Sequence, residues 1–326
     1  MAQPEESAKE TPAAGVGGPR RPRFMIFAGL SLLLTLALAG VDFAVLGFKN
    51  PVQALSPHYY MALGDSISFG YQPNLDFSSG FADDVLNYLR QTEGQAGVTT
   101  LVNYACVGET TATMIQGGCI GRYAHKGSYT GAQLTAAVNF LSKDRNRGRV
   151  SPVTLEIGAN DLLPDWDTVT CSAGPNAATD LTAMDRNLTQ AILPELTKAL
   201  TTPTGAQAGD LLLLNYYNPF ARVCPNSAPF IQTFNNHLQA DAAQFKVPVV
   251  DVYAAFDSGA GMASNICTYT WYCSSSHDIH PTNKGYEVIA EAVEAAAGLR
   301  MAQGIGSLAS VPLPREAPVW RRSPLA

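Results

Sequence analysis

The sequence predicts an α/β domain in which helices cover both faces of a parallel sheet. Two observations carry this prediction. Five apolar runs are nearly continuous, which is typical of strands that are buried on both faces. Stretches with the apolar spacing of amphipathic helices separate these runs. No linker or internal repeat interrupts residues 56–300, so one domain is the simplest interpretation.

The expected strands and helices alternate along the chain. The predicted strands are residues 58–64, 99–105, 153–159, 210–218 and 247–253. The predicted helices are residues 81–90, 131–141, 178–200, 229–245 and 283–299. In the first of these helices, Val85, Leu86 and Leu89 fall on one face, because residues three and four positions apart are neighbours on a helix.

The composition indicates a globular protein that does not bind nucleic acid. Of the 326 residues, 46% are hydrophobic, which is enough for a full core. Only 15% are charged, and this low share favours a secreted protein. The formal net charge is −6, whereas proteins that bind nucleic acid present clustered positive charge.

The N-terminal region has the pattern of an export signal. Residues 1–23 are predicted to be disordered and end in a basic flank. Residues 24–48 begin with a long apolar run, which is a signal peptide or an N-terminal membrane anchor. The small residues Ala37 and Ala39 favour cleavage. In both cases the domain of residues 56–300 is secreted or extracytoplasmic, because the basic flank stays inside. Residues 301–326 lack periodicity and are predicted to be a flexible tail.

The cysteines agree with an oxidising compartment, because an even number in an exported chain indicates disulfides. Sequence alone does not choose among the pairings that six cysteines allow. We expect pairing in chain order, which closes two short loops and one longer loop. The candidates are Cys106, Cys119, Cys171, Cys224, Cys267 and Cys273.

Four residues follow predicted strands, at the sheet edge where doubly wound folds bind ligands. Ser66 follows the first strand, Gly108 the second and Asn160 the third, and His280 comes after the last. A serine becomes a nucleophile when a base removes its proton and donors receive the developing oxyanion. By itself, Gly-Asp-Ser is more typical of a turn. Together, the hydroxyl, the unobstructed N–H, the carboxamide and the imidazole are the groups that acyl transfer to serine needs.

The sequence blocks around these residues resemble those of the GDSL family, or SGNH hydrolases, which are serine esterases and lipases. The matching residues are Gly64-Asp65-Ser66-Ile67, with Ile in place of the usual Leu, then Asn103, Ala105 and Gly108, then Gly158, Asn160 and Asp161, and finally His280-Pro281. They occur in the family's order and span residues 60–290.

The resemblance implies a flavodoxin-like fold, a three-layer α/β/α sandwich with a five-stranded parallel sheet. It implies that Ser66 is the nucleophile and that His280 is the general base. It also implies an oxyanion hole formed by the N–H groups of Ser66 and Gly108 and by the side-chain amide of Asn160.

One block departs from the family pattern. The family usually has an aspartate three residues before the histidine, but His277 occupies that position here. The only nearby acid is Asp278, two residues before His280. We expect Asp278 to orient the imidazole. The alternative is a backbone carbonyl from residues 276–278, as in family members that work with a dyad.

The resemblance implies a hydrolase of small-molecule or lipid esters, acting through an acyl-enzyme on Ser66. We expect a preference for short to medium acyl chains. Leu162, Leu163 and Trp166 are candidates for an apolar acyl site, and packing into the core is at least an equal alternative for them. A carbohydrate acetylesterase of the same family is the alternative. This chemistry requires neither a metal nor an organic cofactor. The sequence does not indicate an oligomeric state.

Three rival interpretations fit the sequence less well. A surface-displayed, non-catalytic α/β binding protein would be expected to lack the catalytic serine, asparagine or histidine, and all three are present. An α/β-hydrolase presents its serine in Gly-x-Ser-x-Gly, which does not occur in this sequence. A zinc site formed by His277, His280, Cys267 and Cys273 does not match the spacing of common zinc motifs.

Overall fold

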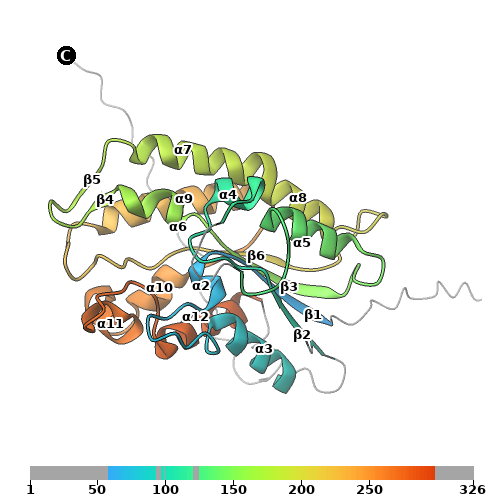
Figure 1. Ribbon diagram of the computed structural model, residues 1–326, viewed down its shortest axis with the longest axis horizontal. Helices are drawn as coiled ribbons and strands as arrows, with labels where there is room; N and C mark the ends of the chain where they lie inside the picture. Colours follow the sequence, from blue (N-terminus) through green and yellow to red (C-terminus); the bar gives the residue numbers. More distant parts are fainter. Residues whose placement is uncertain (1–57, 93–96, 99, 120–124, 298–326) are drawn as a thin grey trace, which may run out of the picture. The chain divides into compact units, whose positions relative to one another are not determined.

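A five-stranded parallel sheet forms the middle layer of the fold (Figure 1). The computed structural model describes residues 58–92, 97–98, 100–119 and 125–297. The segments 1–23, 24–48 and 301–326, for which the sequence predicts disorder, an export signal and a tail, lie outside the described residues. No helix among the described residues is long and apolar enough to cross a membrane.

The sheet has the strand order β2-β1-β3-β6-β7, and all neighbouring strands are parallel. Counted within the sheet, this is the order 2-1-3-4-5 of flavodoxin-like folds. The strands are β1 (Tyr59–Gly64), β2 (Thr100–Asn103), β3 (Val150–Glu156), β6 (Leu211–Leu214) and β7 (Val249–Val250). All five lie within the predicted strand positions except for the start of β3, so the predicted fold class is confirmed.

Helices cover both faces of the sheet, and Figure 1 shows them as two layers. One layer contains α3 (Phe81–Thr92), α10 (Val252–Asp257), α11 (Met262–Tyr269) and α12 (Asn283–Ala296). The other contains α4 (Thr111–Gln116), α5 (Gln133–Ser142), α7 (Ala177–Asn187), the π-helix η3 (Leu188–Ile192), α8 (Leu193–Ala199) and α9 (Ala228–Gln244). Val85, Leu89, Leu134 and Leu141 are buried, as the apolar periodicity of α3 and α5 predicts.

The remaining elements are short. They are α2 (Ser66–Phe69), α6 (Ala159–Leu162), η2 (Leu163–Asp165), the hairpin strands β4 (Trp166–Asp167) and β5 (Ser172–Ala173), and η4 (Trp271–Cys273). Of these, α2 is separated from the end of β1 by one residue, and α6 is separated from the end of β3 by two residues. They therefore begin at the carboxyl edge of the sheet.

Two of the differences between the predicted elements and the structure have a clear local cause. The helix expected over residues 178–200 is interrupted by the π-helix η3, which ends two residues before Pro194. Because proline has no N–H to donate to the carbonyl four residues earlier, the helix changes there to the wider π form. The strand expected over residues 247–253 ends at Val250, because Asp251 caps α10 by accepting the N–H of Ala254 at 3.0 Å.

The disulfides pair in chain order, as predicted. They join Cys106 to Cys119, Cys171 to Cys224 and Cys267 to Cys273, with sequence separations of 13, 53 and 6. Three disulfides are typical of a protein that folds in an oxidising compartment.

The carboxyl ends of β1 and β3 lie very close together at Gly64. A Cβ added to this residue would lie 1.7 Å from the carbonyl oxygen of Glu156, and its φ of +130° is unfavourable for any side chain. The N–H of Asp65 donates to the same carbonyl oxygen at 3.1 Å. Glycine is therefore required at the point where the chain leaves β1 for the edge of the sheet.

We expect Gly64→Ala to lower the free energy of unfolding by more than about 3 kcal/mol, because the methyl group would collide with backbone. The matched control is Gly148→Ala. Gly148 has a φ of +70° but no atom within 4 Å of an added Cβ, so only the backbone strain of about 1–2 kcal/mol applies. Urea unfolding with the disulfides intact measures both. Equal losses in the two variants would contradict this account of Gly64.

Candidate active site

Ser66 lies at the carboxyl edge of the sheet, as the first residue of α2. The preceding residue, Asp65, caps this helix, since its Oδ1 accepts the N–H of Ile67 at 3.0 Å. Only Asp65 separates the end of β1 from the start of α2. This tight turn fixes the position of the Ser66 hydroxyl, and the residue is 7% exposed.

Two short hydrogen bonds connect Ser66, His280 and Asp278. Nε2 of His280 lies 2.8 Å from Oγ of Ser66, and Nδ1 lies 2.6 Å from Oδ1 of Asp278. A carboxylate only accepts hydrogen bonds, so Nδ1 carries the ring proton. Nε2 is then the acceptor for the serine hydroxyl. The structure thus brings together three predicted residues, of which Ser66 and His280 are 214 positions apart.

Asp278 reaches the imidazole although it precedes His280 by two residues rather than three. Its Oδ1 accepts both the backbone N–H of His280, at 2.8 Å, and the ring Nδ1–H. Burial raises the pKa of Asp278, but the hydrogen bonds and charge of His280 outweigh burial and hold that pKa below its ordinary value. His277 is exposed, and its Nδ1 lies 3.2 Å from the carbonyl oxygen of Tyr272.

The backbone around His280 is held on both sides. Its carbonyl oxygen accepts the N–H of Trp271 at 3.0 Å, and the hydroxyl of Tyr217 donates to the carbonyl of Ile279 at 2.7 Å. The Tyr71 ring lies against the imidazole, with 4.6 Å between ring centroids. The loop before α12 therefore presents the imidazole in one orientation.

Two backbone N–H groups are available beside the hydroxyl. Gly108 and Ser66 both line the pocket at the site, and no described residue accepts the N–H of either one. Gly108 has a φ of +85°, a conformation that side chains disfavour. The loop after β2 can therefore turn its N–H toward the pocket. A carbonyl oxygen that becomes negative needs donors of this kind.

The side-chain amide of Asn160 lies at the same pocket, at the start of α6. Its Nδ2 donates to the carbonyl oxygen of Glu109 at 2.9 Å and to Oδ2 of Asp65 at 3.2 Å. The amide is thus held between the loop after β2 and the turn after β1. The longer of the two bonds, to Asp65, is the weaker restraint.

Two other residues of the sequence blocks connect the loops of the site. Nδ2 of Asn103 donates to the carbonyl of Ser68 at 2.7 Å, which joins β2 to α2. Asp161 accepts the N–H of Thr111 at 2.9 Å and its hydroxyl at 2.5 Å, which joins α6 to α4. These side chains fix the loops that carry Ser66, Gly108 and Asn160.

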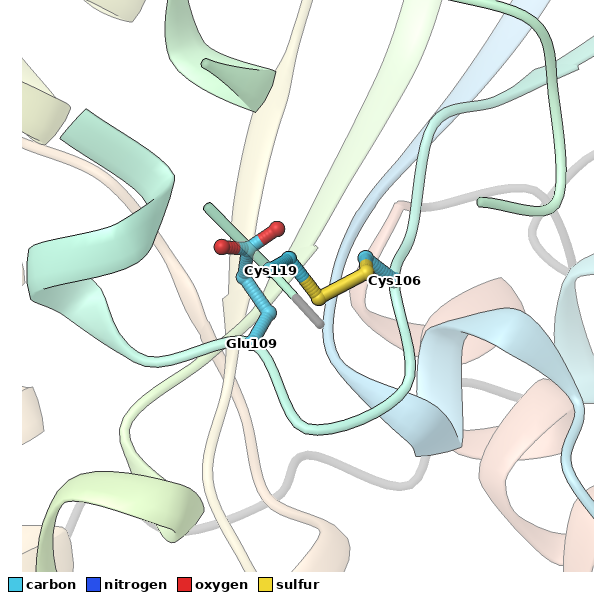
Figure 2. Close-up of side chains that lie close together, drawn as sticks. All are labelled: Cys106, Glu109 and Cys119. Atoms are coloured by element: carbon cyan, nitrogen blue, oxygen red, sulfur yellow. A yellow bond between two sulfur atoms is a disulfide. The ribbon is translucent and has the colours of Figure 1, made fainter. Parts of the chain in front are cut away.

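Figure 2 shows Glu109 beside the disulfide between Cys106 and Cys119. The ligand atoms of the three residues lie within 4.8 Å of one another, a spacing that could hold a metal. The two sulfur atoms are bonded to each other, however, so they offer no thiolate. The same reasoning applies to the zinc interpretation that involves Cys267 and Cys273, which also form a disulfide.

A pocket of about 150 Å³ opens over the Ser66 hydroxyl. Its lining includes Ser66, Gly108, Asn160 and His280 together with apolar side chains. The apolar members are Ile67, Val107, Ala159, Leu163, Pro219 and Ile279.

Of the three candidates for the acyl site, Leu163 lines the pocket. The other two pack into the core, which is the alternative that the sequence leaves open for them. Leu162 is buried in the main core, and Trp166 packs against Phe220 and Phe230 in a separate cluster under the β4–β5 hairpin.

Sequence reasoning missed several residues that support the site. Gln133 bonds both backbone groups of Gly64, and Tyr216 donates its hydroxyl to Oδ2 of Asp65 at 3.2 Å. Glu156, at the end of β3, is buried next to Asp65. The only signal in the sequence was the acidic residue itself, within an otherwise apolar predicted strand.

The family model for GDSL-like lipase/acylhydrolase matches residues 60–293, which is more than half of the chain. The chain therefore belongs to this family and is an ester hydrolase of the esterase and lipase class. No curated protein matches the sequence.

Solved structures similar to this chain include three enzymes of low sequence identity. An acetylxylan esterase from Geobacillus stearothermophilus is 16% identical, with a TM-score of 0.48 over 76% of this chain and 97% of that one. A lipase from a goat rumen metagenome is 20% identical, with a TM-score of 0.49 over 73% and 97%. A member of the lipolytic G-D-S-L family from Veillonella parvula is 17% identical, with a TM-score of 0.45 over 73% and 97%.

We expect Asp278→Asn to lower kcat for ester hydrolysis by about 10²–10⁴-fold, because an amide no longer fixes the Nδ1–H tautomer or stabilises the charged ring. The control is His277→Ala, which removes the exposed neighbouring imidazole and should leave kcat within about twofold. Steady-state kinetics on p-nitrophenyl butyrate measures both variants. An unchanged kcat in Asp278→Asn would show that a backbone carbonyl is sufficient.

Proposed function

We propose that the protein is an exported serine esterase that cleaves carboxylic esters of short to medium acyl chains through an acyl-enzyme on Ser66. The observation that carries the proposal is the line of two short hydrogen bonds from Asp278 through His280 to Ser66, of 2.6 and 2.8 Å. This is the arrangement of nucleophile, base and orienting group that defines serine hydrolysis on unrelated folds.

In the first half of the reaction, Ser66 Oγ attacks the carbonyl carbon of the ester. The hydroxyl proton passes to Nε2 of His280, and the carbon–oxygen double bond opens to a tetrahedral oxyanion. Asp278 stabilises the imidazolium that forms, because its carboxylate already accepts the Nδ1–H. Nε2–H then donates its proton to the leaving alcohol, and the acyl group stays on Ser66.

The oxyanion would be received by the N–H groups of Ser66 and Gly108 and by Nδ2 of Asn160. Both hydrogens of the Asn160 amide have acceptors in the structure, so one of them must be shared with the oxyanion. We assign this role to the hydrogen that points to Asp65, since its bond is the longer of the two. Loss of one oxyanion donor typically costs about 3–4 kcal/mol of transition-state stabilisation.

In the second half, a water molecule replaces the alcohol. Nε2 of His280 takes a proton from the water, the resulting hydroxide attacks the acyl carbon, and a second oxyanion forms at the same donors. The proton then returns from Nε2 to Ser66 Oγ as the carboxylic acid leaves. The cycle restores the free enzyme and uses only groups that the chain supplies.

The size and lining of the pocket support short acyl chains. A cavity of about 150 Å³ holds a molecule the size of benzene, so acyl groups of up to about six carbon atoms fit. The side chains of Ile67, Leu163 and Ile279 offer an apolar surface to such a chain. Among the residues that line the pocket, the aromatic ones are Tyr216 and Tyr217, and both are buried, which leaves little surface for stacking on a sugar ring.

The disulfides support a site of action outside the cytoplasm. Export would use residues 24–48, as a cleaved signal or as an anchor. In the second case, the enzyme would act at the outer face of the membrane that holds it.

A fluorophosphonate probe should label the wild-type protein at Ser66, because the activated hydroxyl attacks phosphorus as it attacks an ester carbonyl. Ser66→Ala should not be labelled, and its kcat for p-nitrophenyl butyrate should fall by about 10⁴-fold or more. The control is Ser128→Ala, which removes an exposed serine hydroxyl and should be labelled like the wild type. Mass spectrometry of the labelled peptide identifies the site. If folded, disulfide-intact protein is neither labelled nor active, a non-catalytic binding protein is the better interpretation.

A chain-length series of p-nitrophenyl esters should give the highest kcat/KM between two and about six acyl carbons. Longer chains should lose kcat/KM, because they extend beyond the pocket. Acetylated xylan, measured by acetate release in the same buffer, should be a poorer substrate than p-nitrophenyl acetate. The opposite order would favour the carbohydrate acetylesterase.

A further inference from the structure

A pair of carboxyl groups lies beneath the proposed nucleophile, and the reaction does not use it directly. Glu156 ends β3, and Asp65 follows the end of the neighbouring strand β1. Gly64 pairs with Glu156 across the two strands, and the N–H of Asp65 donates to the carbonyl oxygen of Glu156 at 3.1 Å. The two residues are 2% and 1% exposed, and each carboxyl group acts on the pKa of the other.

Glu156 lines a small cavity whose other members are mostly apolar. They are Ile67, Leu214, Val252 and Ile289, together with Asn215, Tyr216 and Tyr217. Neither oxygen of Glu156 accepts a hydrogen bond of normal geometry from a described residue. Within the described part of the chain, no lysine or arginine forms an ion pair with Glu156 or with Asp65.

The titratable groups whose charges act on this pair are three tyrosines, one imidazole and two further acids. Tyr216 and Tyr217 follow β6, Tyr286 comes from α12, and His280 comes from the loop before α12. Glu109, in the loop after β2, and Asp161, on α6, both act on Asp65. Of these, only His280 can carry positive charge, and it acts on Asp65. An ionised Glu156 would therefore be a buried anion beside a second anion, with no cation of its own.

Unlike Glu156, Asp65 accepts several hydrogen bonds. Its Oδ1 accepts the N–H of Ile67, and its Oδ2 accepts the hydroxyl of Tyr216 and Nδ2 of Asn160. Such donors favour the ionised form of a carboxyl group. Of the two acids, Asp65 is the one that can be the carboxylate.

We propose that Glu156 is a neutral carboxylic acid that donates its O–H to Asp65 and thereby fixes the carboxylate that holds the amide of Asn160. Glu156 is then a positioning residue, since it touches neither the substrate nor the reacting atoms. The proposal rests on the oxyanion role of Asn160 in the proposed function.

The electrostatics agree with this geometry. Burial raises the pKa of Glu156 well above its ordinary value, and the negative charge of Asp65 raises it further. Burial also raises the pKa of Asp65, although its donors act in the opposite direction. The pKa of Glu156 is thus the more strongly raised of the two, which agrees with a proton on Glu156 rather than on Asp65.

The shared proton has a catalytic consequence. The O–H of Glu156 draws part of the charge of Asp65 away from Asn160, so one hydrogen of the amide is available to an oxyanion. At high pH, loss of the proton would leave two adjacent carboxylates. Their repulsion would move Asp65, and the Asn160 amide would move with it.

The test compares Glu156→Gln with Glu156→Leu, with kinetics on p-nitrophenyl butyrate across pH. Glutamine keeps a donor toward Asp65, so its kcat at pH 7 should stay within about threefold of the wild type. Leucine has no donor, so its kcat should fall about tenfold or more while KM changes less. The alkaline fall in kcat of the wild type should be absent in Glu156→Gln. If the two variants have the same kcat and the same pH profile, the positioning role is wrong.

Infrared spectroscopy tests the protonation of Glu156 without any turnover. The difference between wild type and Glu156→Gln at pH 7 should contain the C=O stretch of a protonated carboxyl group. Its absence would overturn the proposal. A protonated Glu156 in a protein that a fluorophosphonate does not label would instead contradict the proposed function and leave the protonation of Glu156 standing.

Thermal unfolding gives a third readout. The folded state keeps a proton that the unfolded chain releases above about pH 4.5. The wild type should therefore lose stability relative to Glu156→Gln as pH rises from there, and the difference in Tm should grow with pH. A constant difference would count against a neutral Glu156.

The matched control is Asp241→Asn on α9. Burial, followed by the charge of Asp185, raises the pKa of Asp241 to about 7, but the residue lies outside the site. This substitution should leave the fall in kcat at alkaline pH unchanged. If it alters that fall as Glu156→Gln does, the effect is not specific to the pair beneath Ser66.

Discussion

The carboxyl group of Asp65 is the point at which the segments of the site meet. It accepts the N–H of Ile67 in α2, the hydroxyl of Tyr216 after β6 and the side-chain N–H of Asn160 after β3. One short acidic side chain therefore contacts both the helix that carries Ser66, the proposed nucleophile, and the amide of Asn160, a proposed oxyanion donor. No lysine or arginine pairs with Asp65 among the described residues, so hydrogen bonds hold its carboxyl group in place. The close approach of β1 and β3 at Gly64 makes this convergence geometrically feasible.

The sheet could be predicted from the sequence because its strands are buried on both faces and are therefore continuous apolar runs. The long helices could also be predicted, because each buries one row of side chains at helical spacing. The short helices α2, α4 and α10 were not predicted. Each has only four to six residues, too few to show a period. Side-chain caps define them instead, from Asp65, Thr110 and Asp251.

The residues around the hydroxyl could be predicted because parallel strands end at one edge, and a residue directly after a strand lies at that edge. Asp278 could be named only as the nearest acid. Its contact with the imidazole depends on a local turn in which one oxygen accepts two N–H groups of His280. Glu156 and Tyr216 lay beyond sequence reasoning, because their contacts with Asp65 depend on how β1, β3 and β6 are aligned in the sheet.

The Cys106–Cys119 bond closes a loop that contains Gly108, and the two cysteines have a sequence separation of 13. A newly made, reduced chain would have to order this segment without the covalent restraint, at a greater loss of chain entropy. The loop that carries Gly108, a proposed oxyanion donor, is therefore ordered most readily after thiol oxidation. On the proposed export route, maturation of the enzyme would be coupled to passage into an oxidising environment, and nascent chains that still have free thiols would be poor catalysts.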